Sequence, residues 1–261
     1  MSENRLPEPL ALDQSTVLIV GGTSGIGLET ARQLLGAGCR VAVAGRNAER
    51  GARARDLLVP LGPPFLITGD ASSLEGCTTI TAQAEASLGR IDVLINATIP
   101  AILPDLFHRT PPDVIPDTLT GIALPPMLMT AAVLPGMRAR RTGVIVNIAS
   151  DAGKVATPGE AVIGAAMAAI IMFTRTIAME AKRDGVRVNV LTPSLVSGTQ
   201  TSERILKEGF SARLFAKAAA MADLGVAEPS DIAAMIVFLA SPAGRRLTGQ
   251  AISVNGGISA A

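Results

Sequence analysis

A glycine-rich turn near the N-terminus is the first feature of this chain whose residue types and spacing suit chemistry. Gly21, Gly25 and Gly27 follow the apolar run 17–20 and precede an amphipathic stretch. At a turn from strand to helix, glycines let backbone N–H groups approach a pyrophosphate. The spacing G-x-x-x-G-x-G is not specific alone, because ordinary turns also need glycine. Its position predicts a phosphate site with the candidate residues Gly21, Thr23, Ser24, Gly25, Ile26 and Gly27.

The end of the second apolar run supplies residues that could select the nucleotide. Ala44 and Gly45 are followed there by Arg46 and Asn47. An acidic side chain at this place would bind the 2′-hydroxyl of a ribose, whereas arginine suits a 2′-phosphate. We therefore predict NADP(H) rather than NAD(H) as the cofactor, with Arg46 and Asn47 in its site. The alternative that Arg46 is an ordinary solvated arginine stays open.

Short β-branched runs alternate with longer helical patterns, and these elements must position the candidate residues. Strands are expected at 16–20, 40–44, 65–68, 91–95, 144–148, 187–191 and 251–254, and helices notably at 25–35, 73–88, 126–140, 161–182 and 230–239. Apolar strands that alternate with helices are typical of a parallel sheet covered on both faces. The sequence predicts one doubly wound α/β domain over 15–261, after an N-terminal tail of residues 1–14.

Prolines mark the irregular part of this pattern. The stretch 100–135 holds eight of the 17 prolines. Pro126 has no N–H to donate to the carbonyl of Ile122, so a helix through this point must start or kink there. We expect the helix to begin at Pro125 and Pro126. The segments 97–124 and 194–225 are expected to be insertions that line a ligand cleft.

Composition limits the function classes and the compartment. Lys and Arg number 23 against 22 Asp and Glu, a balance that argues against nucleic-acid or anionic-membrane partners. Two cysteines are too few for a disulfide framework, and residues 1–14 contain no apolar run typical of a signal peptide. The apolar run 161–173 is shorter than the ~20 residues of a spanning helix. We expect a soluble, cytoplasmic protein.

From about Ser15 to Gly257 the chain resembles the short-chain dehydrogenase/reductase family. The similar segments are 20–27, 69–71, 92–97, 187–194, 248–250 and 254–257. The resemblance implies a seven-stranded parallel sheet of the Rossmann type with a dinucleotide across the strand ends. It also implies further cofactor-binding residues, namely Asp70, Ala71, Asn96, Pro193 and Val196. The chain departs from the family pattern at Ala97, Thr98, Ser194 and Asn255.

The resemblance further implies a catalytic group of Asn, Ser, Tyr and Lys, of which this chain keeps one member. Ser150 lies thirteen residues before Ile163, the family's interval from Ser to Tyr. Ile163 and Met167 stand where the family has Tyr and Lys, Ile122 stands near the Asn position, and the chain has no tyrosine. A positioned acid typically contributes ~10²–10⁴ in rate. Efficient carbonyl reduction by the family's route is therefore not expected, although Ser150 could still donate a hydrogen bond.

These replacements leave two explanations and three functions open. Residues 163 and 167 are i and i+4 on one helix face, so the change gives an apolar cleft floor, either by drift or as a fit to an apolar ligand. The protein is then an atypical oxidoreductase for a small apolar substrate, redox-neutral or very weakly reducing. Alternatively, it is a non-catalytic NADP(H)-binding subunit or sensor, or a fold that has lost the nucleotide. A homodimer or homotetramer is expected, with a hetero-oligomer as the alternative, because 161–173 is apolar nearly all round.

Other residues are less suited to chemistry. His108 is the only histidine, and its pairing with Asp105 follows no spacing rule. Glu160 is interpreted as an acid that favours the start of the following helix. One histidine and two distant cysteines predict no metal site.

Overall fold

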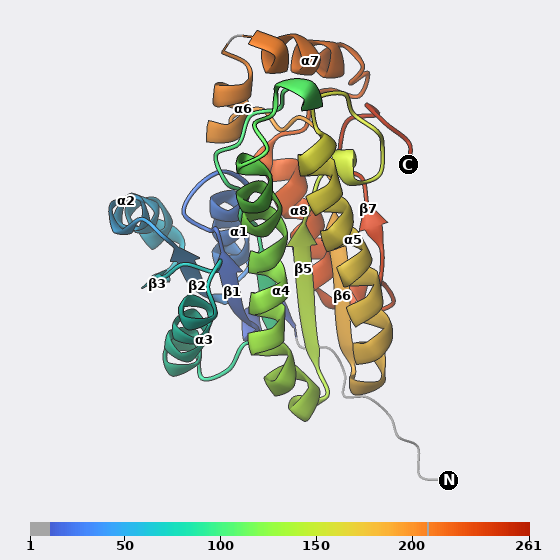
Figure 1. Cartoon of the computed structure of the whole chain (residues 1–261). Coiled ribbons are helices and arrows are strands. Elements are labelled where there is room, and N and C mark those ends of the chain that lie inside the picture. The colour runs from blue at the N-terminus through green and yellow to red at the C-terminus, as the bar shows by residue number, and fades with distance from the viewer. Residues whose placement is uncertain (1–10, 208) are drawn as a thin grey trace.

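The computed structural model describes residues 11–207 and 209–261, and its strands form one seven-stranded parallel sheet (Figure 1). The strand order is β3-β2-β1-β4-β5-β6-β7. The strands are β1 Thr16–Val20, β2 Arg40–Gly45, β3 Phe65–Thr68, β4 Val93–Asn96, β5 Gly143–Ile148, β6 Val186–Leu191 and β7 Ala251–Ile252. This arrangement confirms the predicted doubly wound α/β domain. Of the predicted tail, residues 1–10 lie outside the described residues.

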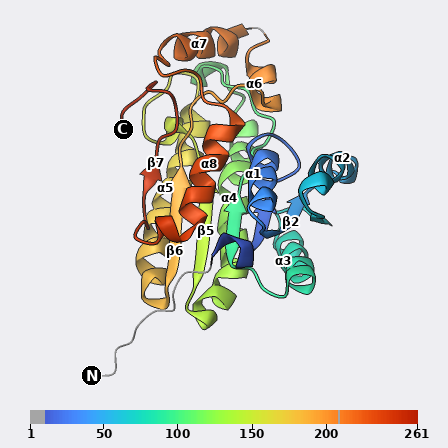
Figure 2. The same cartoon turned by 180° about the vertical axis from the view of Figure 1, so that it is seen from behind.

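Helices cover both faces of the sheet, as the continuous apolar strands require. The long helices are α1 Gly25–Gly36, α2 Ala48–Leu58, α3 Leu74–Leu88, α4 Val114–Arg140, α5 Ala161–Ala181 and α8 Pro229–Ala240. One core cluster joins the sheet to α1 and α8, and another joins its opposite face to α3, α4 and α5 (Figures 1 and 2). Two shorter helices, α6 Gln200–Ile205 and α7 Gly209–Ala220, lie over the carboxyl ends of the strands (Figure 1).

Aliphatic side chains pack between the sheet and the helices on both of its faces. Every residue of β1 is buried, and the side chains of Val17 and Ile19 face one core cluster while Leu18 and Val20 face the other. This alternation within an all-apolar strand follows from the two-residue period of a β-strand. Burial of apolar surface on both faces therefore fixes the sheet in the middle of the molecule.

The expected start of the fourth long helix was wrong. The helix α4 begins at Val114 and continues through Pro125 and Pro126 to Arg140. Neither proline can donate to the carbonyl of Gly121 or Ile122, so these two helical hydrogen bonds are missing. Both prolines are buried, and the helix packs along its length against α5 and the sheet. Tertiary packing therefore outweighs the local cost of the prolines.

Helices α4 and α5 are also longer than the apolar run counted in the sequence. By length and hydropathy alone, Val114–Arg140 and Ala161–Asp184 would suffice to cross a membrane. Part of each packs against the sheet, as in the core helices of many soluble proteins. The exposed face of α5 carries large apolar side chains, among them Met172 and Met179, each 60% exposed.

Candidate functional site

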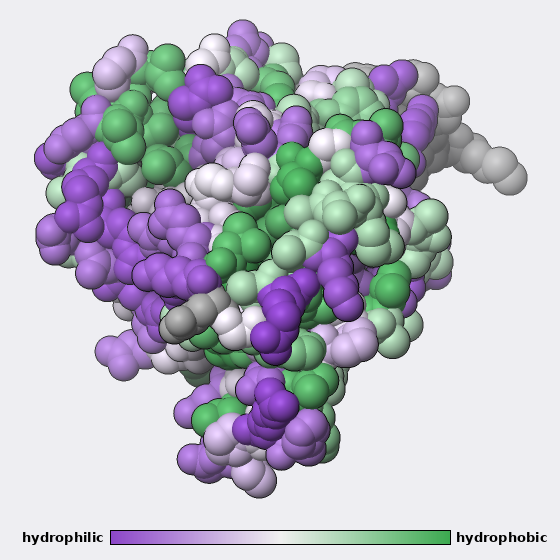
Figure 3. Space-filling model, turned by 90° about the horizontal axis from the view of Figure 1, so that it is seen from above, coloured by the Kyte–Doolittle hydropathy of each residue, from purple (hydrophilic) through white to green (hydrophobic). Residues whose placement is uncertain are grey.

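A deep cleft opens at the carboxyl ends of the strands, where parallel α/β sheets bind their ligands. Its volume is about 880 Å³, and its walls come from the turn after β1, the ends of β2 and β5, the start of α5, and α6 and α7. Figure 3 looks onto this end of the molecule and shows apolar residues interspersed among hydrophilic ones. The cleft brings together residues from distant parts of the sequence, from Val20 to Ser259.

The glycine turn forms one end of the cleft. Gly21 has a φ of +85°, and a Cβ at this position would lie 2.5 Å from the carbonyl oxygen of Ala97. Gly25 has a φ of +52° and opens α1. Ser24, the residue before the helix, does not cap it with its side chain, so the first N–H groups of α1 keep their capacity to bind an anion. Gly21, Thr23, Ser24, Gly25 and Ile26 all line the cleft as predicted.

Gly27 has a different role in the same turn. It is buried and does not line the cleft. A Cβ on Gly27 would collide with the carbonyl group of Gly21. The absence of a side chain therefore lets the start of α1 pack tightly against the turn, which fixes the shape of the predicted phosphate site.

Basic residues flank the turn on the side of β2. Arg46 is exposed and lines the cleft together with Asn47, whose side chain caps α2 by accepting from the backbone N–H of Arg50 at 2.7 Å. Arg50 lines the cleft as well and was not predicted. Its place in the first turn of α2, shortly after Arg46, was the available signal. Two guanidinium groups at this place suit a phosphate on the adenosine ribose.

The two residues predicted for the adenine end also lie in the cleft. Asp70 and Ala71 line the cleft, and the Asp70 carboxylate accepts from the hydroxyl of Ser72 at 2.7 Å and from its backbone N–H at 3.0 Å. These hydrogen bonds hold the pKa of Asp70 below its usual value, aided by the charge of Arg46. Asp70 is therefore a fixed acceptor and not a proton donor.

The remaining residues predicted to bind the cofactor differ in whether they line the cleft. Pro193 and Val196 line the cleft. Asn96 is 3% exposed, lies outside the lining, and donates from Nδ2 to Oδ1 of Asn147 at 2.8 Å. Asn147 in turn donates to the hydroxyl of Thr174 at 2.8 Å. Asn96 therefore ties β4 to β5 inside the sheet, and its predicted role in cofactor binding stays a prediction.

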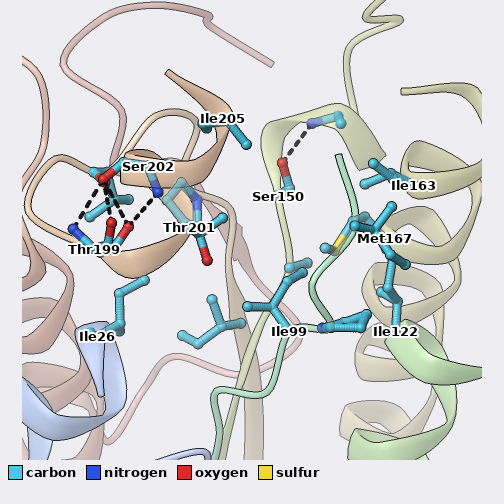
Figure 4. Close-up of a pocket in the computed structure, with 18 of the residues that line it drawn as sticks. Ile26, Ile99, Ile122, Ser150, Ile163, Met167, Thr199, Thr201, Ser202 and Ile205 are labelled. Carbon is cyan, nitrogen blue, oxygen red and sulfur yellow. Dashed lines mark hydrogen bonds between the residues drawn. The ribbon is translucent and has the colours of Figure 1, made fainter. Parts of the chain in front are cut away.

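The other end of the cleft places a hydroxyl beside an apolar wall. Ser150 Oγ accepts from the backbone N–H of Ala152 at 3.2 Å, which leaves the hydroxyl proton available for a ligand (Figure 4). Ile163, Met167 and Ile122 belong to one apolar cluster, and Figure 4 shows them beside Ser150. Met167 is 4% exposed and Ile122 is 1% exposed. The predicted face shared by residues 163 and 167 is thus the apolar floor of the cleft.

Two charged residues after Ser150 hold the C-terminal segment. The buried carboxylate of Asp151 accepts from Nδ2 of Asn255 at 2.6 Å and from the hydroxyl of Ser259 at 2.5 Å. Lys154 lies 4.0 Å from Asp151 and donates to the hydroxyl of Ser253. Burial is the main cause that lowers the pKa of Lys154. Both side chains are therefore engaged in holding the chain end against the segment after β5.

Glu160 is different from these two residues. It lines the cleft and precedes α5, yet its side chain makes no capping hydrogen bond to that helix. Burial raises the pKa of Glu160 to about 7. The interpretation of Glu160 as an acid that favours the helix start is therefore not supported by this geometry, because a carboxylate bound to helix N–H groups would have a lowered pKa.

The other candidates considered from the sequence lie outside the cleft. His108 is exposed on a short 3-10 turn, and Asp105 pairs with Arg109 at 3.8 Å. Neither His108 nor Asp105 lines the cleft. Cys39 and Cys77 are buried free thiols. Within the described residues, no group of three metal-ligating side chains comes together.

The residues at the first end fit a phosphorylated dinucleotide. The glycine turn lies tight against the backbone of Ala97, which excludes a Cβ at Gly21, the start of α1 has N–H groups without a side-chain cap, and Arg46 and Arg50 supply positive charge. Asp70 offers an acceptor at the far side. The glycine turn, the basic residues after β2 and Asp70 therefore lie in one cleft, as the sequence predicted.

Comparisons with known proteins support this assignment. A family model described as enoyl-(acyl carrier protein) reductase matches residues 20–259. Acetoacetyl-CoA reductase from Shinella zoogloeoides is 36% identical over 245 residues, which cover 92% of this chain and 96% of that protein. The 3-oxoacyl-(acyl-carrier-protein) reductase of Synechocystis sp. is 30% identical over 254 residues, which cover 95% of this chain and 98% of that protein.

Solved structures give the same result. A short-chain type dehydrogenase/reductase from Mycobacterium ulcerans superposes with a TM-score of 0.88 at 25% identity, covering 95% of this chain and 91% of that chain. A 7α-hydroxysteroid dehydrogenase complexed with NADH and 7-oxo glycochenodeoxycholic acid gives 0.87 at 25% identity, covering 96% of both chains. The matches in sequence, sheet order and glycine turn together place this chain in the short-chain dehydrogenase/reductase family of oxidoreductases.

Proposed function

We propose that this protein binds NADP(H) in preference to NAD(H) and reduces a carbonyl group on a small apolar substrate, without the family's tyrosine and lysine. One observation carries the proposal: a single cleft joins the glycine turn and Arg46 to the hydroxyl of Ser150 and an apolar floor. The names of the relatives support a carbonyl substrate, since they are reductases of acetoacetyl-CoA and of 3-oxoacyl groups.

One end of the cleft binds the nucleotide, and the other end orients the substrate. Backbone N–H groups at the start of α1 bind the pyrophosphate, Arg46 and Arg50 bind the 2′-phosphate, and Asp70 accepts from the adenine. When bound, the nicotinamide supplies the hydride. Ser150 donates a hydrogen bond to the carbonyl oxygen and orients it, while Ile122, Ile163 and Met167 exclude water from the reacting carbon.

Efficient proton delivery is the weak point of this arrangement. A serine hydroxyl is a poor acid, and neither Ile163 nor Met167 carries a proton to give. We therefore propose a turnover well below the family's ordinary rate, by the ~10²–10⁴ that a positioned acid contributes. A redox-neutral reaction on the same bound substrate is the other form of this proposal.

A second function is favoured by the same two side chains. If Ile163 and Met167 have ended catalysis, the protein is a nucleotide-binding subunit or sensor that pairs with an active relative. The exposed apolar face of α5 supports assembly into a homodimer, homotetramer or hetero-oligomer, because 60% exposure of Met172 and Met179 leaves apolar surface to bury. We further propose a cytoplasmic location and no nucleic-acid or membrane partner, in line with the balanced charge.

A fluorescence titration with NADPH tests nucleotide binding, and the absence of Trp and Tyr from this chain gives a low protein background. We expect saturable binding that is tighter for NADPH than for NADH. A null result up to millimolar NADPH would overturn the proposal in favour of a fold that has lost its cofactor. NADPH oxidation with acetoacetyl-CoA, ethyl acetoacetate and 2-octanone then separates the two functions, since binding without turnover favours the subunit or sensor.

A further inference from the structure

We propose that Glu160 is the proton donor of this cleft, giving its proton to the carbonyl oxygen of the substrate in place of the acid that is absent at Ile163. The inference rests on the proposed reductase function and deepens it. It assigns a catalytic role to a residue outside the four positions that the family resemblance implies.

Glu160 directly precedes α5, the helix that carries Ile163 and Met167 of the apolar floor. Its carbonyl oxygen accepts from the N–H of Gly164 at 2.6 Å, which ties Glu160 to the first turn of that helix. Glu160 and Ile163 are three positions apart, about one helical turn. Both line the cleft.

The same turn packs against the segment that holds Ser150. A Cβ on Gly164 would lie 2.6 Å from the carbonyl oxygen of Ala152, and the N–H of Ala152 is the group that Ser150 caps. Only a residue without a side chain permits this approach of α5 to the end of β5. The first turn of α5 and Ser150 therefore form neighbouring parts of one wall.

Other acidic groups of the cleft are already engaged. Asp70 is held by Ser72 at the adenine end, and Asp151 is held by Asn255 and Ser259. The side chain of Glu160 has no hydrogen-bond or ion-pair partner among the described residues. The lining includes no histidine, cysteine or tyrosine. Glu160 is thus the one carboxyl group of this lining that is free to exchange a proton with a ligand.

The surroundings favour the protonated form of this carboxyl group. The ring of Phe210 at the start of α7 packs against the neighbouring Gly159, and burial raises the pKa of Glu160 to about 7. A general acid works best when its pKa lies near the operating pH. Outside the nucleotide end, the other ionisable groups of the cleft lining are Asp151 before α5, Arg204 on α6, and Arg213 and Lys217 on α7. Lys154 and Glu203 belong to the same segments but lie outside the lining.

The proton balance of the step is simple. The carbonyl carbon accepts a hydride and forms a new C–H bond, while the O–H bond of Glu160 breaks and a new O–H bond forms on the substrate oxygen. The carbonyl compound is reduced to an alcohol and the cofactor is oxidised. The carboxylate left on Glu160 then takes a proton from water at the open side of the cleft.

The test compares Glu160→Gln with Glu203→Gln, whose side chain is exposed on α6 outside the cleft lining. Both variants and the parent are assayed for NADPH oxidation with ethyl acetoacetate and acetoacetyl-CoA from pH 5 to 9. We expect the parent rate to fall as the pH rises through about 7, because the acid form is consumed. Glu160→Gln should lose that pH limb and at least ~10²-fold of kcat at pH 6, whereas Glu203→Gln keeps both.

A second readout does not depend on turnover. Protein labelled with ¹³C at the glutamate carboxyl groups is titrated by NMR, and one carboxyl signal with a midpoint near 7 should be present in the parent and absent from Glu160→Gln. Glu160→Asp, which keeps an acid on a shorter stem, covers the case in which the glutamine variant fails to fold.

The possible outcomes distinguish the role of Glu160 from the proposed reductase function. Turnover that is unchanged in Glu160→Gln overturns the role of Glu160 and leaves the proposed reductase intact. NADPH binding without any turnover overturns this inference and favours the subunit or sensor. Absence of NADPH binding overturns the proposed function and this inference with it. Absence of a glutamate that titrates near 7 removes the physical basis for the acid.

Discussion

The two ends of the cleft are lined by different kinds of chemical group. The nucleotide end consists of backbone N–H groups, glycines and charged side chains, and its geometry is fixed by Gly21 and the start of α1. The other end consists of one hydroxyl, aliphatic side chains and a half-buried carboxyl group, at Ser150, Ile163, Met167 and Glu160. The properties of the nucleotide end depend on backbone conformation and charge, whereas those of the other end depend on burial. Substitutions at the two ends should therefore impair binding or stability for different physical reasons.

The largest expected effect comes from placing a charge in the apolar floor. Met167 is 4% exposed within a cluster of aliphatic residues, so Met167→Lys should lower the free energy of unfolding by about 3 kcal/mol or more. Urea denaturation measures this loss. Leu74→Lys is the control at an exposed apolar position, because Leu74 on α3 is 73% exposed and lies outside both the cleft and the apolar face of α5, and it should change stability by less than about 0.5 kcal/mol. An equal loss in both variants would contradict an apolar floor.

A conformational substitution probes the nucleotide end. Gly21→Ala adds a Cβ 2.5 Å from the carbonyl oxygen of Ala97 at a φ of +85°. We expect a loss of about 2–3 kcal/mol in stability and the loss of NADPH binding, since the turn must shift. Denaturation and fluorescence titration measure the two effects. Gly36→Ala, with no atom within 4 Å of its added Cβ, should leave binding unchanged. Retained affinity in Gly21→Ala would show that the turn does not hold the phosphates.

Charge selectivity is expected to follow Arg46. Arg46→Glu should weaken NADPH binding by about 10- to 100-fold and change NADH binding much less, because the new carboxylate repels a 2′-phosphate. Parallel titrations with the two cofactors report the ratio. Arg55→Glu on α2, outside the cleft lining, serves as the control. A similar loss for NADPH and NADH would argue against a 2′-phosphate site at Arg46.

The smallest effect is a pH-dependent change in stability at Glu160. Burial raises its pKa from 4.5 to about 7, so the folded state binds the extra proton between these values. This group therefore contributes a loss of stability as the pH rises through that window. Glu160→Gln should match the parent near pH 4 and be more stable by about 1–2 kcal/mol at pH 8. Thermal unfolding at the two pH values measures the difference, and Glu203→Gln should show none.

The sequence was most informative where pattern and structure share a physical cause. Strand β1 has the predicted bounds, because its unbroken apolar run is buried on both faces of the sheet. Strand β3 also has the predicted bounds, although it lies at the edge of the sheet and is mostly exposed. The glycine turn was predictable because the φ of Gly21 demands glycine. Helix α4 was not, since the cost of Pro125 and Pro126 is local while the packing that outweighs it is tertiary.

Within the site, side-chain chemistry was easier to predict than side-chain surroundings. Asn96 follows a strand like other cleft residues, yet its amide turns into the sheet toward Asn147. Gly27 belongs to the motif but supports it from beneath. Glu160 was interpreted by its place before a helix, whereas its burial and lack of a capping bond are visible only in three dimensions.

The sequence by itself determined the layered α/β fold, the phosphate turn, the basic residue after the second strand, and the aliphatic residues at 163 and 167. Each of these follows from local conformation or from residue chemistry, which the chain carries without folding. Only the tertiary structure decided which polar groups are engaged and which are free, and how deeply a carboxyl group is buried. Those properties depend on contacts between distant segments, because the free energy of a charge is set by everything that displaces water around it.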